Sequence, residues 1–201
     1  MATTTPNYGW PVPTSTDYVK DGATAIEALG DAIDATVFGL GQGLKLIKTQ
    51  TIGTAVSSVA VTGAFSTTYD AYKIVIANTV TSASATINMI LGATATGYYY
   101  VSAAGLFSTG ASSNQAGAAN ATSWLAVGNT PTTNASNSLE ILSPFLTAKT
   151  FYNASYVNVT GGAAGYMSGY LDNTTSYTAF TLTPSTGTLT GGTIYVYGYT
   201  K

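Results

Sequence analysis

The pattern of apolar residues changes its period near residue 45, and this change limits the possible folds more than any other feature. Residues 17–37 (DYVKDGATAIEALGDAIDATV) carry apolar residues three and four positions apart, which predicts one amphipathic helix. From residue 44, apolar residues alternate with Thr, Ser and Asn, which predicts short β-strands. Eight of the fourteen charged residues precede residue 50. The sequence therefore predicts a short helical segment followed by an uncharged β-rich head, a layout typical of an assembly protein.

The composition argues against several classes of function. Only 7% of the 201 residues are charged, and histidine, cysteine and arginine are absent. These absences remove disulfides, thiolate or imidazole metal ligands and histidine-based acid–base chemistry. Six lysines and a net charge of −2 give no basic patch for nucleic acid. We therefore expect no cofactor, no metal and no nucleic-acid partner.

The N-terminal sequence has no basic region followed by an apolar run, so we expect no secretion signal and synthesis in the cytoplasm. The longest apolar runs, such as residues 74–77, are far too short to cross a bilayer. We expect no membrane insertion.

Residues 1–16 predict an extended docking arm. Pro11 and Pro13 fix their own φ angles and bias the preceding residues toward extended conformations. Tyr8 and Trp10 are the large side chains of this segment. Tyr8, Trp10, Pro11 and Pro13 are therefore candidates for docking onto another component of an assembly, and a free tail is the alternative.

Residues 17–43 predict a helical stalk and a glycine-rich hinge. Thr16-Asp17 is a helix start signal, and Gly39, Gly41 and Gly43 predict the helix end. A heptad seam with a 3-4-3-4 spacing runs along the helix, and isoleucine in such a seam favours three or more helices. The seam consists of Val19, Gly22, Ile26, Leu29, Ile33, Thr36 and Leu40, of which Val19, Ile26, Leu29, Ile33 and Leu40 are the trimer candidates. A single helix packed on its own head is the alternative.

Residues 44–201 predict an antiparallel, jelly-roll-like β-sandwich head, because short strands follow one another at regular spacing. The expected strands are 44–52, 55–61, 72–79, 86–91, 97–101, 122–127, 139–146, 151–158, 165–171, 179–183 and 193–199. Residues 102–121 and 128–137 are predicted as loops. In the last strand, Ile194 and Val196 alternate with tyrosines, so both of its faces are apolar or aromatic. We expect the second face to lie in a subunit interface.

Catalytic residue sets are missing from the head. Its acids are Asp70, Glu140 and Asp172, which are far apart in sequence, and no histidine exists to activate a serine. We expect no enzyme; a glycan-degrading module that uses two of these acids is a minor alternative. Tyrosine is in excess, with fifteen copies, and exposed aromatic residues near Asn and Thr suit sugar or protein contacts. The candidates for such a ligand surface are Tyr98, Tyr99, Tyr100 and Trp124.

Several segments resemble tailed-bacteriophage structural proteins of the minor tail, fibre and head-fibre types. The N-terminal motifs are Tyr8-Gly9-Trp10-Pro11-Val12-Pro13-Thr14, residues 16–23 and the helix at 26–33. In the head, residues 65–76 (FSTTYDAYKIVI) and 180–199 (FTLTPSTGTLTGGTIYVYGY) resemble phage β-sandwich heads, including the final Tyr197-Gly198-Tyr199. Residues 83–163 carry no such motif.

The resemblance implies a trimeric virion component that is anchored by its N-terminus and displays its head. The expected partners are other copies of the chain, other virion proteins and a host-surface glycan or protein. Two alternatives remain open: a capsid decoration or head-fibre protein, and a carbohydrate-binding or glycan-degrading module.

Overall fold

The computed structural model describes residues 3–14, 18–40, 43–130, 132, 135–159 and 161–200, without the side chains of 38–40, 113–115, 126–130 and 135. The chain divides into two compact units, Met1–Gly43 and Leu44–Lys201. They are described separately below as the N-terminal unit and the head.

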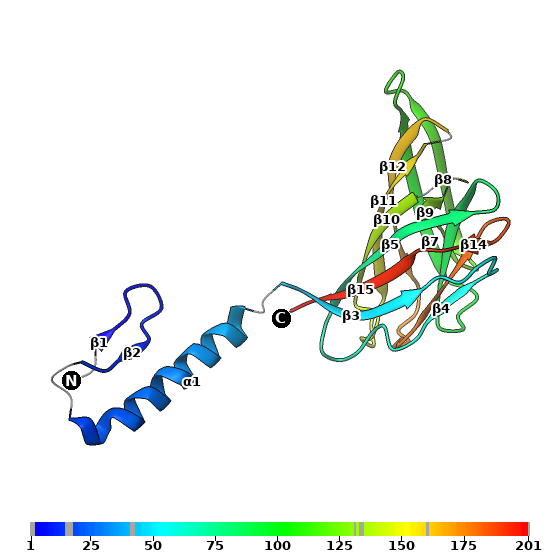
Figure 1. Cartoon of the computed structure of the whole chain (residues 1–201). Helices are drawn as coiled ribbons and strands as arrows, with labels where there is room; N and C mark the ends of the chain where they lie inside the picture. Colours follow the sequence, from blue (N-terminus) through cyan, green and yellow to red (C-terminus); the bar gives the residue numbers. More distant parts are fainter. Residues whose placement is uncertain are drawn as a thin grey trace. The chain divides into compact units, whose positions relative to one another are not determined.

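The N-terminal unit begins with a β-hairpin (Figure 1). Strand β1 (Thr3–Thr4) pairs antiparallel with β2 (Pro11–Val12), so the segment is not the single extended arm that the sequence predicts. Pro11 is extended as expected, but the chain reverses before it. Gly9, with φ of +68°, donates its backbone N–H to the carbonyl of Thr5 at 3.0 Å and closes the turn.

One helix follows the hairpin. A 3₁₀ turn, η1 (Val19–Asp21), leads into α1 (Gly22–Leu40). The predicted cap at Thr16-Asp17 lies outside the described residues; the residue before the turn is Tyr18, whose side chain caps nothing. Gly39 lies within the helix, which ends at Leu40, inside the glycine-rich segment predicted to end it; Gly41 is outside the described residues. No described helix is long and apolar enough to cross a membrane.

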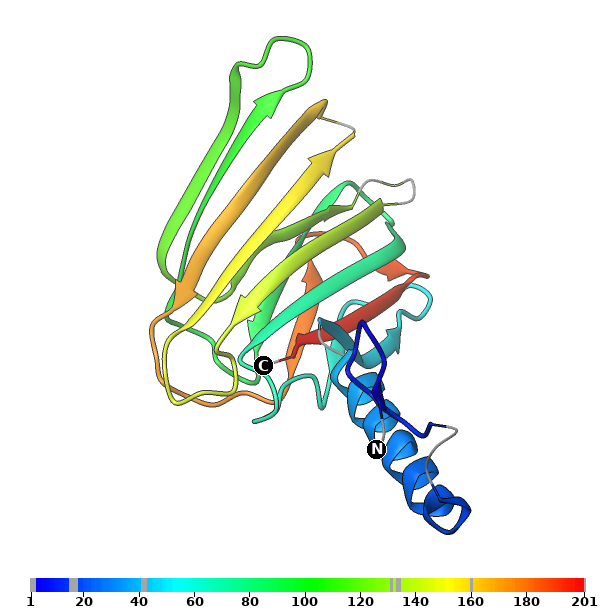
Figure 2. The same cartoon turned by 90° about the vertical axis from the view of Figure 1, so that its left-hand side faces the viewer.

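The head contains two antiparallel sheets. The larger sheet has the order β3-β15-β5-β10-β11-β12-β7-β8, with β14 paired to one end of β5, and Figure 2 shows these strands side by side from the green β7–β8 hairpin to the red β15. Its strands are β3 (Leu44–Thr51), β5 (Ala71–Thr81), β7 (Tyr98–Leu106), β8 (Ser112–Ala121), β10 (Ala135–Leu142), β11 (Thr150–Asn158), β12 (Ala163–Leu171), β14 (Leu189–Thr190) and β15 (Thr193–Tyr199).

The smaller sheet packs against one face of the larger one. Its order is β4-β13-β6-β9, and β9 lies against β10 and β11. Its strands are β4 (Val59–Val61), β6 (Ala85–Leu91), β9 (Trp124–Thr130) and β13 (Phe180–Pro184). Because the chain passes from one sheet to the other after β3, β4, β5, β6, β8, β9, β12 and β13, the two sheets are interleaved in sequence.

Alternating side chains build the core between the sheets. In β5, Tyr72, Ile74 and Ile76 are fully buried, and in β6 every second residue, including Ile87 and Met89, is buried. This pattern confirms the prediction of a mainly antiparallel β head, with sandwich-like sheets, after one N-terminal helix.

The prediction of a loop at residues 102–121 is wrong, because most of this range forms strands β7 and β8. Strand β7 continues to Leu106, and β8 pairs with it over most of its length. The sequence hides this hairpin because its Gly, Ala and Ser side chains are all small, so no apolar alternation is visible. In the second predicted loop, β9 extends to Thr130 and β10 begins at Ala135; of the residues between them only 132 is described.

Candidate binding surfaces

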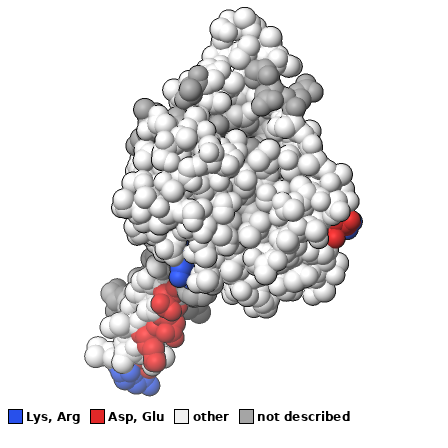
Figure 3. Space-filling view, turned by 90° about the vertical axis from the view of Figure 1, so that its right-hand side faces the viewer, with Lys and Arg blue, Asp and Glu red and all other residues white. Residues whose placement is uncertain are grey.

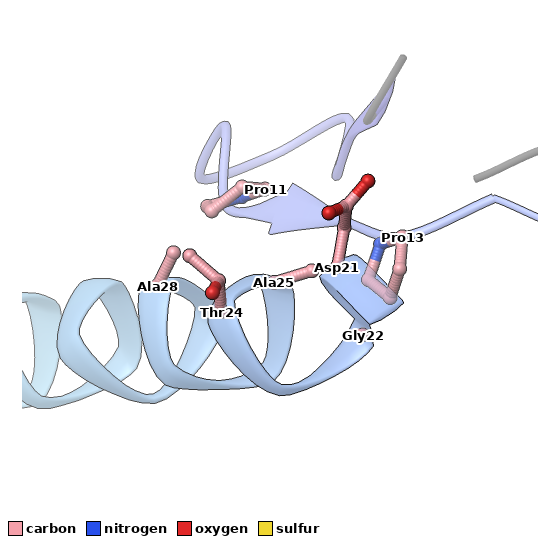
Figure 4. Close-up of a pocket in the computed structure, with 7 residues that line it drawn as sticks. All are labelled: Pro11, Pro13, Asp21, Gly22, Thr24, Ala25 and Ala28. Carbon is pink, nitrogen blue, oxygen red and sulfur yellow. The ribbon is translucent and has the colours of Figure 1, made fainter. Parts of the chain in front are cut away.

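The predicted docking residues pack within the N-terminal unit. The rings of Tyr8 and Trp10 stack with centroids 5.2 Å apart, and Tyr8 remains largely exposed. Trp10 Nε1 donates a hydrogen bond to Thr36 Oγ1 at 2.9 Å, which ties the hairpin to the helix. Pro11 and Pro13 border a hollow of about 400 Å³ against the first turns of α1 (Figure 4). The hairpin therefore covers one side of the helix.

The residues of the predicted heptad seam differ in exposure, because the hairpin covers one side of the helix. Leu29 and Ile33 are half-buried, whereas Ile26 is 66% exposed and Val19 98% exposed; the side chain of Leu40 is outside the description. The half-buried positions of α1 are 22, 25, 29, 32, 33 and 36, and most of them belong to the side that carries the Trp10 contact and the proline hollow. The seam residues therefore do not share one open face.

A different stripe of the helix is open. Val19, Ala23, Ile26, Gly30 and Val37 are exposed, and with half-buried Ile33 they form the series 19-23-26-30-33-37, with 4-3-4-3-4 spacing. This spacing places all six on one face of a helix. We call this series the open stripe. Its flank carries Glu27, Asp31 and Asp34.

Two of the predicted ligand-surface residues are core residues. Tyr98 and Trp124 are fully buried, so their assignment to a ligand surface is wrong. Their rings lie 5.2 Å apart, edge to face, and Trp124 also packs 4.5 Å from Tyr152. The Tyr98 hydroxyl accepts a hydrogen bond from the backbone N–H of Leu91 at 2.8 Å. Burial raises the pKa of Tyr98 to about 12.

Side chains alternate between the two faces of the sheet along β7, so Tyr98 and Tyr100 lie on one face and Tyr99 on the other. Tyr100 is half-buried against the core. Tyr99 points to the opposite face, where its ring stacks on that of Tyr170 with centroids 4.8 Å apart and planes within 5° of parallel. Of the four predicted ligand residues, Tyr99 and Tyr100 therefore remain beside a surface.

We define the outer face as the face of the larger sheet that turns away from the core. Strand register places Tyr99 opposite Tyr170, and Tyr170 opposite Phe151. Two residues along the same strands, Asn153 lies opposite Ser168, whose hydroxyl donates to Asn153 Oδ1 at 2.8 Å. Aromatic and polar positions thus succeed one another along β11 and β12.

Two hollows mark this face. The first, here called the aromatic hollow, has a volume of about 390 Å³ and is lined in part by Tyr99, Val101, Ala118, Phe151, Ser168 and Tyr170. The second, here called the polar hollow, has about 350 Å³ and is lined in part by Lys73, Ser138, Glu140, Asn153, Ser155 and Tyr166. The Asn153–Ser168 hydrogen bond lies where they meet, because each hollow includes one of its partners.

Charges on the outer face are few, and Lys73 lies opposite Glu140 in the strand register. The Tyr199 hydroxyl donates to Glu140 Oε1, and this hydrogen bond raises the pKa of Tyr199. Lys149 Nζ lies 2.6 Å from Asp172 Oδ1 and 5.3 Å from the ring centroid of Tyr170. The hydrogen bond to Asp172 raises the pKa of Lys149. The side of the head seen in Figure 3, which is opposite to the side seen in Figure 2, also has few charged atoms.

The three acids of the head do not gather into one described cluster. Glu140 lies on β10, Asp172 follows β12, and Asp70 precedes β5. Among the described residues, no group of three acids could hold a metal ion. Sequence reasoning missed Phe151, Tyr166 and Tyr170 as surface aromatics. Their alternation with buried Tyr152 and Met167 was the available signal.

Comparisons of the chain with protein-family models, with curated proteins and with solved structures found no match.

Proposed function

We propose that this chain is a bacteriophage virion structural protein: a homotrimer whose N-terminal unit attaches to the particle and whose jelly-roll-like head is displayed. The observation that carries the proposal is the open stripe of α1. The interleaving of the two sheets along the chain supports the jelly-roll-like description, because jelly rolls alternate between their sheets in this way.

The open stripe is suited to other helices of the same kind. Its exposed members are apolar or small, and Ala23 and Gly30 alternate with the larger Ile26, Ile33 and Val37. A side chain added at Gly30 would meet no atom within 4 Å in the single chain, so room exists for a partner helix to approach closely. Burying one isoleucine contributes about 1.5–3 kcal/mol. In this series Ile26 and Ile33 occupy d positions, and isoleucine at d favours bundles of three or more helices.

The charges of the helix agree with this arrangement. Glu27, Asp31 and Asp34 lie to one side of the stripe, and the hairpin covers the other side. A trimer closed through the stripe would therefore leave the acids in water and the hairpins at its periphery, available to other virion proteins. This matters because like charges at the centre of a bundle would be destabilising.

The test is the native mass of the purified full-length chain. We expect three copies, and we expect Ile26→Asp to give a monomer. Ala35→Asp is the matched control, because Ala35 is equally exposed but lies roughly 160° around the helix from the stripe, at 100° per residue. A monomeric wild type, or trimers from Ile26→Asp, would overturn the proposed assembly.

The location on the particle requires a second experiment. A capsid decoration or head-fibre protein shares the same features of helix and head, and imaging of intact particles separates the two possibilities. Density for three heads at the tail supports a tail fibre or receptor-binding role, and density on the capsid shell supports the decoration role.

A further inference from the structure

From the outer face of the head we infer a binding site for an uncharged glycan, which lies in the aromatic hollow and continues into the polar hollow. This inference rests on the proposed function in one respect only: a displayed head leaves this face accessible.

Aromatic side chains line the first hollow in a way that suits sugar rings. Tyr99, Tyr170 and Phe151 occupy consecutive strands at the same level of the sheet, and Phe151 is 47% exposed. Ala118, which lies opposite Tyr100 on β8, also borders the hollow. Aromatic rings with hydroxyl groups offer an apolar body for the C–H face of a sugar and a polar tip for its hydroxyls.

The absence of charge from this hollow selects an uncharged ligand. None of the residues that line it is charged. The nearest ion pair, Lys149 with Asp172, is closed on itself beside Tyr170. In the aromatic hollow an anionic ligand would lose its hydration without gaining a cation, which costs free energy. In the polar hollow, Lys73 lies opposite Glu140 in the strand register, so the positive charge there has a negative charge beside it.

The two hollows together fit an elongated ligand. They follow each other along β11 and β12, from Phe151 and Tyr170 through Asn153 and Ser168 to Tyr166. Each step of two residues along a strand covers about 6.6 Å, so the line spans several sugar units. Their volumes are at the lower end of the range of ligand pockets, about 300–1,000 Å³.

Polar groups along this line match sugar hydroxyls. The Ser168 hydroxyl donates to Asn153 Oδ1, and this bond orients the side-chain amide of exposed Asn153, whose NH2 group can donate to a ligand. Ser138 and Ser155 add hydroxyls in the polar hollow. Such groups fix the orientation of a ligand whose rings lie on the aromatic residues.

The test is calorimetric titration of the full-length chain with tetrasaccharides of glucose, galactose and N-acetylglucosamine, and with tetragalacturonate as the anionic comparison. We expect at least one neutral tetrasaccharide to bind and tetragalacturonate not to bind. Tyr99→Ala should weaken that binding at least about tenfold. Tyr195→Ala is the matched control, because Tyr195 lies on the same sheet face but lines neither hollow.

Native mass measured on the same samples separates this inference from the proposed function. A monomer that binds a neutral tetrasaccharide overturns the trimer and supports the site. A trimer that binds none of the neutral tetrasaccharides overturns the site alone. The inferred site would also be overturned if Tyr99→Ala and Tyr195→Ala weakened tetrasaccharide binding equally, or if tetragalacturonate bound more tightly than the neutral tetrasaccharides. A changed native mass for Tyr99→Ala would overturn it as well, because a second copy of the chain would then occupy the face.

Discussion

Replacement of Gly165 by alanine tests the packing of β12 against β7 in the head. Gly165 lies opposite Ala104 in the strand ladder. A Cβ atom at residue 165 would lie 2.2 Å from the carbonyl oxygen of Ala103 and 2.8 Å from Ala104 Cα. Both obstacles are backbone atoms, so no side-chain rotation can relieve the contact. The two strands must move apart.

The magnitude follows from this geometry. Overpacking in a tight site costs about 1–3 kcal/mol, and the upper end applies here because the ladder hydrogen bonds are stretched as well. Alanine in a strand is otherwise favoured over glycine by roughly 0.5–1 kcal/mol. We therefore expect a net loss of about 2 kcal/mol for Gly165→Ala. For a domain of this size, that lowers the melting temperature by about 4–8 °C.

The matched control is Gly105→Ala on the neighbouring strand. Gly105 lies opposite Ala164, one position from the Gly165 pair, but the closest atom to an added Cβ is 3.6 Å away. This is an ordinary contact, so we expect a gain of about 0.5 kcal/mol from the strand preference. The two substitutions are chemically identical, and their effects should have opposite signs.

The assay is urea and thermal unfolding of both variants, followed by circular dichroism of the strand signal. The reasoning is refuted if Gly165→Ala is as stable as the wild type, or if both variants change stability by the same amount. A change in the denaturant slope of only one variant would indicate that the unfolded state had changed as well.

Two further predictions concern the buried hydroxyl of Tyr98 and the hydrogen bond between Trp10 and Thr36. Because burial raises the pKa of Tyr98 to about 12, the folded state holds its phenol proton more tightly than the unfolded state does; this contribution is complete below about pH 10 and is lost as the pH rises through about 12. Tyr98→Phe should therefore reduce the fall in the free energy of unfolding between pH 10 and 12, and an unchanged slope would contradict this. In the N-terminal unit, Thr36→Val removes the acceptor of Trp10 Nε1 and should destabilise the hairpin–helix contact by about 1 kcal/mol. Hydrogen exchange of the Trp10 indole, followed by NMR, should become faster, while Thr24→Val should leave it unchanged.

The sequence predicted most strands of the head because large apolar residues alternate in them. The last strand, Thr193–Tyr199, was predicted with the same bounds that the structure shows. The β7–β8 hairpin was missed because its small side chains give no periodic signal, although backbone hydrogen bonds hold it in the ladder. A periodic pattern of apolar residues shows which side chains are buried. Strand pairing through backbone hydrogen bonds needs no such pattern, so the sequence does not reveal it.

The candidate sites depended more on tertiary structure. The sequence pointed to Tyr98–Tyr100, but it could not decide which members of an alternating series face inward. In the structure the Tyr98 side chain lies in the core, and the Tyr99 ring stacks on Tyr170, its register partner on β12, at the outer face. Tyr170 lies far along the chain from Tyr99, so only the ladder brings them together.

The sequence by itself determined the change from one helix to many strands near residue 45, and it determined the scarcity of charge in the head. Both are properties of local composition and period, which do not depend on distant contacts. The tertiary structure decided which side of the helix remains open, because the hairpin that covers the other side is held by Trp10 and Thr36. It also decided which aromatic residues share the outer face, because strand register alone fixes the neighbours of each side chain.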